Sequence, residues 1–196
     1  IPLRRQRQMC IRDSSKISAA FAISNLLHKE GKFKESAKYL KIANDESMKY
    51  KKSDLSLKIK HTEYYRSLKI KNSKNKYLEN SSKYIFIVGM PRSGSTLLEN
   101  ILSLNPEVTD MGEVNFLEES IKEAKDFEDV YDLYEKKVIN QFQSSIIYTD
   151  KSLFNYMYCA VISNFFPKAK IINCIRNPLD NILSIYRANF LKPVSY

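Results

Sequence analysis

The sequence predicts an α/β domain built on a parallel β-sheet and preceded by an α-helical segment. Three observations lead to this fold class. From residue 84 onward, short apolar runs alternate with helix-like stretches, as in sheets whose parallel strands are joined by helices. The first run ends in a glycine-containing loop that leads into a helix, which is typical of an anion-binding turn. With 196 residues, 43% of them hydrophobic, the chain has room for one such core and a small helical appendage.

The two ends of the sequence do not look like parts of the fold. "RRQRQMCIRDS" reads as the translation of a common sequencing adapter, so we expect residues 1–14 to be a sequencing artefact. The other end, "LKPVSY", closes on neither a helix nor a cap. We therefore expect residues 84–196 to be a partial domain that is truncated at its C-terminus.

Residues 15–70 are expected to be helical, beginning with a hairpin that turns at Gly31. A third helix is expected over 53–70. The hairpin resembles one tetratricopeptide (TPR) unit, and a solenoid needs about three units for stability. Apolar and small residues recur at helical spacing on both sides of the turn: Ala19, Ala20, Ile23, Leu26 and Leu27, then Phe33, Ala37, Leu40 and Ala43.

A polar, Asn- and Ser-rich linker is expected at 71–83, before the α/β domain. Strands are predicted where short apolar runs occur, at 84–88, 146–149 and 170–175. Helices are predicted between them, at 96–104, at 114–143 with an acidic interruption, and at 152–164. This order predicts a parallel sheet.

The loop after the first strand has the composition of a phosphate cradle. Gly89 and Gly94 permit tight turns, so that successive N–H groups point at one oxyanion next to a helix N-terminus. Arg92 adds a planar fork of donors. Three hydroxyl side chains complete the donor set: Ser93, Ser95 and Thr96. The alternative is an ordinary strand-to-helix turn.

This loop departs from the ATP-binding P-loop, because Ser95 stands where that motif has lysine. No magnesium-binding aspartate is obvious at the end of a second strand, so triphosphate chemistry is poorly supported. A sulfuryl group carries less charge and can be transferred without a metal by hydrogen bonds and cationic side chains. With only His28 and His61 in the chain, no zinc site is predicted either.

A second anion-binding element is predicted at the third strand candidate. That strand ends at Arg176, and Asn177 and Pro178 suit the start of a helix that carries Ser184. Arg176 and Ser184 are therefore candidates to hold an anion at the carboxyl ends of the strands. The alternative is a surface arginine and an unrelated helix serine.

Together, Pro91–Thr96 and Arg176 with Ser184 resemble the sulfotransferases that use 3′-phosphoadenosine 5′-phosphosulfate (PAPS). In that family a "PRSG[ST]T" loop binds the 5′-phosphosulfate, and an Arg with a Ser eight residues later binds the 3′-phosphate. The sequence is most similar to the bacterial TPR sulfotransferases, which are grouped with the tyrosylprotein sulfotransferases. The resemblance implies a P-loop-like parallel sheet and covers nearly everything after the adapter-like stretch.

The same resemblance implies three catalytic residues. Glu113 in "MGEVNF" matches the base, Lys151 in "TDKSLF" matches a lysine that stabilises the transferring group, and Arg92 assists at the phosphosulfate. Without the family, Glu113 would be a helix N-terminal acid and Lys151 a solvated lysine. The family further implies that PAPS is the donor and that no metal is needed.

We therefore expect a sulfotransferase that acts on a hydroxyl of a peptide tyrosine or a carbohydrate. The alternatives are a P-loop kinase or NTPase and a non-catalytic TPR adaptor. The formal charge of +10 is scattered, and no nucleic-acid motif accompanies it. No apolar run approaches the ~18 residues of a membrane helix, and we expect a cytoplasmic location.

Overall fold

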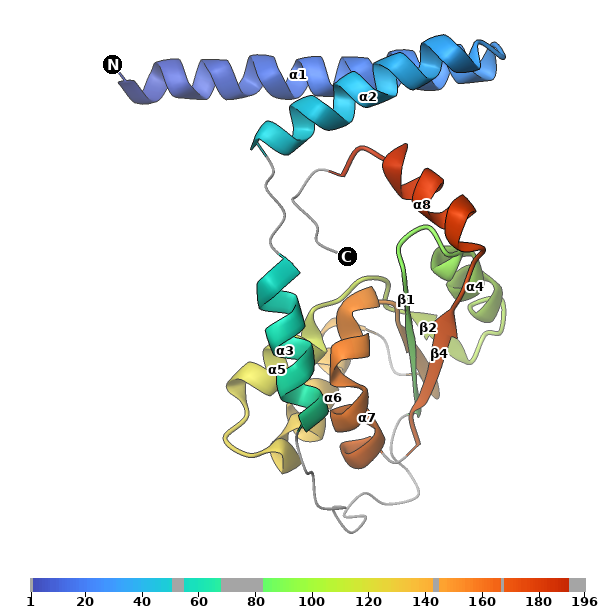
Figure 1. Cartoon of the computed structure of the whole chain (residues 1–196). Coiled ribbons are helices and arrows are strands. Elements are labelled where there is room, and N and C mark those ends of the chain that lie inside the picture. The colour runs from blue at the N-terminus through green and yellow to red at the C-terminus, as the bar shows by residue number, and fades with distance from the viewer. Residues whose placement is uncertain (1, 51–54, 68–82, 143–144, 167, 191–196) are drawn as a thin grey trace. The chain divides into compact units, whose positions relative to one another are not determined.

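A computed structural model of the chain describes residues 2–50, 55–67, 83–142, 145–166 and 168–190 (Figure 1). The chain divides into two compact units. The first comprises Ile1–Leu55 and Pro178–Tyr196, and the second comprises Ser56–Asn177.

The first unit contains the predicted helical hairpin. Helix α1 spans Pro2–Lys29 and helix α2 spans Phe33–Tyr50. Gly31 makes the turn with φ of 74°, a left-handed conformation that glycine adopts without steric cost. The helical prediction for this part of the chain is confirmed, whereas kinship to the TPR family stays a prediction.

The hairpin interface is made of small and apolar side chains. Ser24 and Ser36 lie 3.1 Å apart between their hydroxyl oxygens, and each hydroxyl also donates to the other residue's backbone carbonyl. Ile23 and Leu26, which we expected on the packed face, are 38% and 61% exposed. The buried stripe lies on a different face of α1 from the one we expected, and the buried apolar cluster consists of Ile17, Ala20, Phe21, Leu40 and Ala43.

Helix α8, Pro178–Tyr186, is the helix predicted after the last strand. The whole helix belongs to the first unit, where the Asn44 side chain donates to the Tyr186 carbonyl at 3.0 Å. Just after α8, the Arg187 guanidinium donates to the Asn25 side chain at 3.2 Å.

The second unit is built on a four-stranded parallel sheet with the order β2-β3-β1-β4. Its strands are β1 (Lys83–Gly89), β2 (Val108–Asp110), β3 (Ile147–Asp150) and β4 (Lys170–Cys174). Three of them confirm the strands that the sequence predicts. Strand β2 was not predicted, because three residues are too few to show an alternating or continuous apolar pattern.

The remaining helices follow the predicted pattern with one difference, because the first half of the helix expected at 152–164 is a 3₁₀ helix. The acidic interruption expected within 114–143 is confirmed, since Ala124 takes an extended conformation and a 3₁₀ turn at Phe127–Asp129 follows it. Residues 68–82, which include most of the expected linker, lie outside the described residues, and Lys83 already belongs to β1. The helices of this unit are α3 (Leu55–Ser67), α4 (Ser95–Leu102), α5 (Phe116–Glu123), α6 (Val130–Gln141) and α7 (Cys159–Phe165), with 3₁₀ helices η1 (Phe127–Asp129) and η2 (Leu153–Tyr158).

An aromatic core fixes the sheet against its helices. Figure 1 shows α5, α6 and α7 on one side of the sheet and α4 on the other, as expected for parallel strands. Tyr84 of β1 contacts Tyr134 of α6 in an edge-to-face arrangement, with ring centroids 5.1 Å apart. The centre of this core consists of Tyr84, Phe86, Tyr134, Tyr148 and Phe166, all at most 2% exposed.

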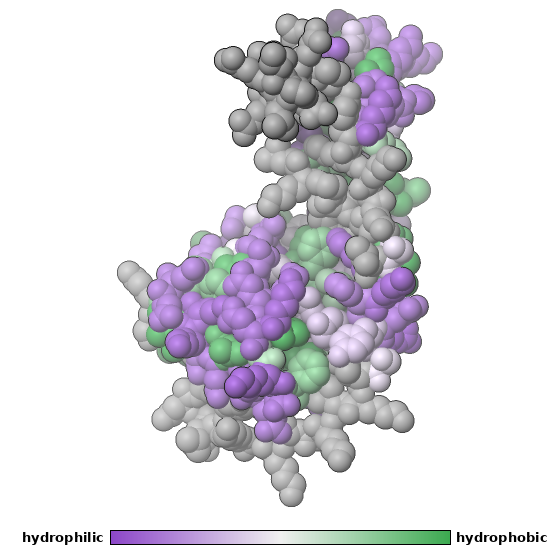
Figure 2. All heavy atoms as spheres, turned by 90° about the vertical axis from the view of Figure 1, so that its left-hand side faces the viewer, coloured by the Kyte–Doolittle hydropathy of each residue, from purple (hydrophilic) through white to green (hydrophobic). Residues whose placement is uncertain are grey.

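Hydrophilic side chains cover much of the face in Figure 2, and apolar side chains form smaller patches between them. Within the described ranges, no helix combines the length and the apolar character that crossing a bilayer requires.

Candidate active site

The four strands of the second unit run parallel, so the segments that follow them start at one edge of the sheet. Glu113 follows β2, Lys151 follows β3, the loop 89–94 follows β1, and Arg176 follows β4. Because the sheet order is β2-β3-β1-β4, these four features lie along the edge in that same order.

The loop at 89–94, named the anion loop here for its predicted role, begins at a position that only glycine can occupy. Gly89 has φ of 140° and pairs with Cys174 of β4. A Cβ atom at Gly89 would lie 2.5 Å from the Cys174 carbonyl oxygen, closer than non-bonded atoms approach. The strand therefore passes into the loop with its backbone directly against β4.

The next turns use two further left-handed residues. Arg92 has φ of 65° and is the one non-glycine residue with positive φ in the described part of the chain. Gly94, with φ of 102°, then starts helix α4 at Ser95. The first N–H groups of α4 have no acceptor within their own helix, and the helix dipole adds partial positive charge at this end. This combination is suited to an oxyanion.

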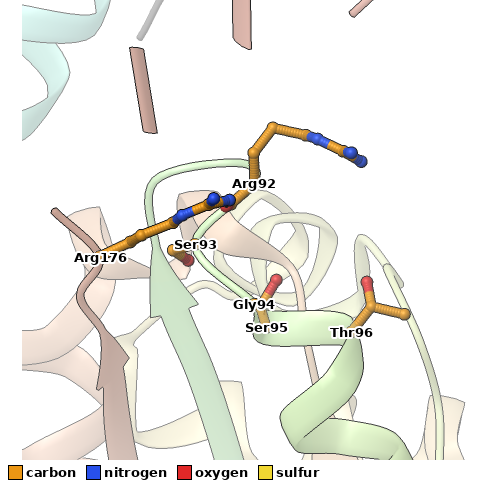
Figure 3. A pocket seen from close by; sticks show the side chains of 6 residues that line it. All are labelled: Arg92, Ser93, Gly94, Ser95, Thr96 and Arg176. Carbon is orange, nitrogen blue, oxygen red and sulfur yellow. The ribbon is translucent and has the colours of Figure 1, made fainter. Parts of the chain in front are cut away.

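The predicted loop residues and Arg176 line one open pocket of about 380 Å³ (Figure 3). Arg176 reaches across the loop, and its Nη1 donates to the Arg92 carbonyl oxygen at 3.2 Å. The hydroxyls of Ser95 and Thr96 point toward the side on which the Arg92 guanidinium lies. Two strands thus bring two guanidinium groups and the N-terminus of α4 to one hollow. Its full lining is Arg92, Ser93, Gly94, Ser95, Thr96 and Arg176.

One polar atom of the loop is left without a partner. The Ser93 hydroxyl oxygen is buried and finds no hydrogen bond within the described part of the chain. Buried hydroxyls in folded proteins are nearly always paired with protein, solvent or ligand. The unsatisfied hydroxyl therefore fits a loop that donates to a bound anion.

Ser184, the predicted partner of Arg176, lies on α8 in the first unit, whereas Arg176 lies in the second. The joint grip of the two residues on one anion therefore stays a prediction.

Glu113 and Lys151 are brought together. The Lys151 ammonium lies 3.1 Å from Oε1 of Glu113. The lysine side chain is 8% exposed and the glutamate 68% exposed, so Lys151 is not the solvated lysine of the alternative reading. Gly112, with φ of 67°, makes the turn that leads into Glu113.

A second carboxylate at this place, Glu99 of α4, was not predicted. Its Oε1 accepts hydrogen bonds from the Gly112 N–H at 3.2 Å and the Thr149 hydroxyl at 3.0 Å. Its Oε2 lies 3.7 Å from the Lys151 ammonium. Burial raises the pKa of Glu99, although the Thr149 hydroxyl and the Lys151 charge oppose the shift. The sequence did hold one signal for Glu99. It lies four residues after Ser95, and residues four apart share one face of a helix.

Known proteins resemble this part of the chain in sequence. A profile described as "Sulfotransferase family" matches residues 84–146 and 129–195, together more than half of the chain. The chain belongs to the sulfotransferase family. A relative described as "Uncharacterized protein", from Aquifex aeolicus (strain VF5), is 29% identical over 133 residues. That match covers 56% of this chain and 18% of the relative's own length.

Every predicted site residue of this sulfotransferase-family chain lies within the matched span, from the loop at 89–96 to Ser184. The TPR-like hairpin lies before it. Assignment to the TPR or tyrosylprotein branch of the family therefore remains a prediction.

The sheet of this sulfotransferase-family domain does place an aspartate at the end of the strand beside β1. Asp150 is fully buried, where its carboxylate accepts from the Tyr134 hydroxyl at 2.9 Å and the Ser152 N–H at 2.9 Å. Burial raises the pKa of Asp150 to about 7 against the opposing effect of these hydrogen bonds. Its oxygens are thus committed to protein donors, unlike the magnesium-binding aspartate of a P-loop NTPase.

In the described ranges of this sulfotransferase-family chain, no three His, Cys, Asp or Glu side chains gather as a metal site would require.

Proposed function

We propose that the protein transfers the sulfuryl group of PAPS to an acceptor hydroxyl. The observation that carries this proposal is the pocket in which a lysine-free anion loop and Arg176 meet. A donor with two separate anionic groups needs cationic and N–H donors from more than one strand, and this edge of the sheet offers them. Membership of the sulfotransferase family supports the same reaction class.

The loop residues suit the 5′-phosphosulfate end of the donor. The first-turn N–H groups of α4, the hydroxyls of Ser93, Ser95 and Thr96, and the Arg92 guanidinium would hold its oxygens. Arg176, with Ser184, would hold the 3′-phosphate. These assignments use only hydrogen bonds and cationic side chains, so binding is expected without a metal.

The chemistry requires three groups at the reacting centre. The acceptor oxygen attacks sulfur, the bond between sulfur and the 5′-phosphate oxygen breaks, and adenosine 3′,5′-bisphosphate leaves. Glu113, exposed beside Lys151, would take the acceptor proton. Lys151 and Arg92 would offset the negative charge that develops on the transferring and leaving oxygens.

Calorimetric titration with adenosine 3′,5′-bisphosphate tests the donor site. Binding is expected in EDTA without magnesium, and Arg176→Ala should weaken it at least about tenfold, as expected for the loss of a charge-assisted contact. Lys168→Ala, on the segment before β4, is a matched control that should bind normally. Binding of ATP with magnesium instead of the bisphosphate would overturn the proposal in favour of a kinase or NTPase.

Transfer of radioactive sulfate from PAPS tests the acceptor and separates an enzyme from a non-catalytic adaptor. A panel of tyrosine peptides and a panel of oligosaccharides distinguish the two acceptor classes. Nucleotide binding without transfer to any hydroxyl or to water would favour the adaptor.

A further inference from the structure

Lys151 is held between two carboxylates that differ sharply in exposure. The Glu113 side chain is 68% exposed, whereas the Glu99 side chain is 4% exposed. The distances from the ammonium are 3.1 Å to Glu113 and 3.7 Å to Glu99. One partner can therefore meet an acceptor, and the other cannot leave the protein interior.

Glu99 also joins the segments that present the proposed base and the lysine. Its Oε1 accepts from Gly112, the residue before Glu113, and from Thr149, two residues before Lys151. Backbone hydrogen bonds run beside these contacts, from the Met111 N–H to the Thr149 carbonyl and from the Lys151 N–H to the Gly112 carbonyl. The carboxylate thus bridges α4 and the ends of β2 and β3.

We propose that Glu99 is a positioning residue that holds Lys151, and through Gly112 also Glu113, at the anion loop. This inference rests on the proposed function. Glu99 lies one helical turn after Ser95, and both side chains are buried. The lysine is therefore tied to α4, the helix that begins at the loop.

The proposed reaction explains why Lys151 would need a second carboxylate partner. When Glu113 accepts the acceptor proton, it loses its charge and with it most of its attraction for Lys151. The buried Glu99 carboxylate is not placed to take that proton, so its contact with the ammonium would persist while charge develops on the leaving oxygen. Even a displacement of about 1 Å of a catalytic group can lower a rate by about 100-fold.

Glu99→Gln is the informative variant, because it keeps an acceptor oxygen for Thr149 and Gly112 but removes the charge that faces Lys151. We expect PAPS turnover, measured with water or the best acceptor, to fall by about tenfold or more. The Kd for adenosine 3′,5′-bisphosphate should change by less than about threefold, because Glu99 does not line the loop pocket. Glu118→Gln, which removes an exposed carboxylate paired with Lys122, is the matched control and should leave both quantities unchanged.

A double-mutant cycle separates positioning from a general effect on folding. In a Lys151→Gln background, Glu99→Gln should lower turnover by less than about twofold, because its effect passes through the lysine. Equal losses in both backgrounds would overturn the inference, as would unchanged turnover in Glu99→Gln.

If Glu99→Gln does not fold, Glu99→Asp and Thr149→Val carry the test, since both loosen the carboxylate and keep its charge. Their kcat must fall while bisphosphate binding is retained, and an unchanged kcat overturns the inference. Failure of the unaltered protein to bind the bisphosphate would instead count against the proposed function.

Discussion

The Glu113 carboxylate is the most accessible ionisable group next to Lys151, and its contact at 3.1 Å is made on the solvent side of the lysine. An exposed carboxylate of this kind can reach an acceptor hydroxyl without rearrangement of the core. The backbone before Glu113 is held in place, because the Gly112 N–H donates to the Glu99 carboxylate. Glu113 is therefore the residue whose loss should separate chemistry from binding most cleanly.

Replacing Glu113 with Gln should lower the rate of sulfuryl transfer by at least about 100-fold, the contribution of a general base. The affinity for adenosine 3′,5′-bisphosphate should stay nearly unchanged, because Glu113 does not line the anion pocket. Transfer kinetics and calorimetry on the same preparation measure the two effects. A variant with the kcat of the unaltered protein would remove Glu113 from the role of base.

Asp150 gives a prediction about pH and stability. In the folded protein burial raises its pKa to about 7, whereas an unfolded aspartate titrates near ~4. Between these values the folded state holds a proton that the unfolded state has released, so this residue lowers the free energy of unfolding as the pH rises from about 4 to about 7.

The variant Asp150→Asn should not show this fall in the free energy of unfolding, because an amide does not titrate. The amide can still hydrogen-bond with the Tyr134 hydroxyl and the Ser152 N–H. Urea unfolding at several pH values measures the comparison. The stability of Asp150→Asn relative to the unaltered protein should rise with pH and level off above about 7. A difference that does not depend on pH would contradict the raised pKa.

At the scale of elements, the turn from β1 to α4 depends on close approach of two backbones. Gly89→Ala would place a methyl group 2.5 Å from the Cys174 carbonyl oxygen at a φ of 140°. We expect the β1–β4 pairing to open locally and the free energy of unfolding to fall by about 3 kcal/mol or more, as for other strained backbone positions.

Gly94→Ala is the matched comparison for this prediction, because a Cβ there meets no atom within 4 Å although φ is 102°. Only the backbone strain remains, and it should cost about 1–2 kcal/mol. Thermal or urea unfolding of both variants measures the difference. A smaller loss for Gly89→Ala than for Gly94→Ala would show that β4 does not constrain the loop.

The elements that the sequence reveals best are those with a strong local signal. The apolar runs of β1, β3 and β4 and the loop between β1 and α4 are visible without a structure, since each is fully encoded in neighbouring residues. Strand β2 is not, because its three residues belong to the sheet only through pairing with β3. The interruption after α5, in contrast, is signalled locally by the acidic run that begins at Asp126.

The candidate site divides in the same way. Arg92 and Arg176 stand out because they follow apolar strands at positions typical of anion binding. Glu99 and Asp150 do not, because an acidic residue in a helix or after a strand usually faces solvent. Only the folded sheet shows that both carboxylates are buried and hydrogen-bonded.

At the scale of the whole molecule, the formal charge is +10 for the printed sequence and +7 without the adapter-like residues 1–14, so in either case a net positive charge favours an anionic donor. The affinity for adenosine 3′,5′-bisphosphate should therefore decrease several-fold when sodium chloride is raised from about 50 mM to about 500 mM, because salt screens both the field and the direct contacts. Calorimetry across a salt series measures this decrease. Constant affinity would indicate that short-range hydrogen bonds alone determine binding.

At Arg92, the binding role proposed for the side chain opposes the stability of the protein. Its φ of 65° is a conformation that glycine adopts freely and arginine adopts at a cost of about 1 kcal/mol or more. Arg92→Gly would relieve that strain and remove the guanidinium from the anion pocket at the same time. Selection for thermal stability alone would therefore drive this position toward glycine, and a stabilised variant obtained that way should be tested first for loss of donor binding.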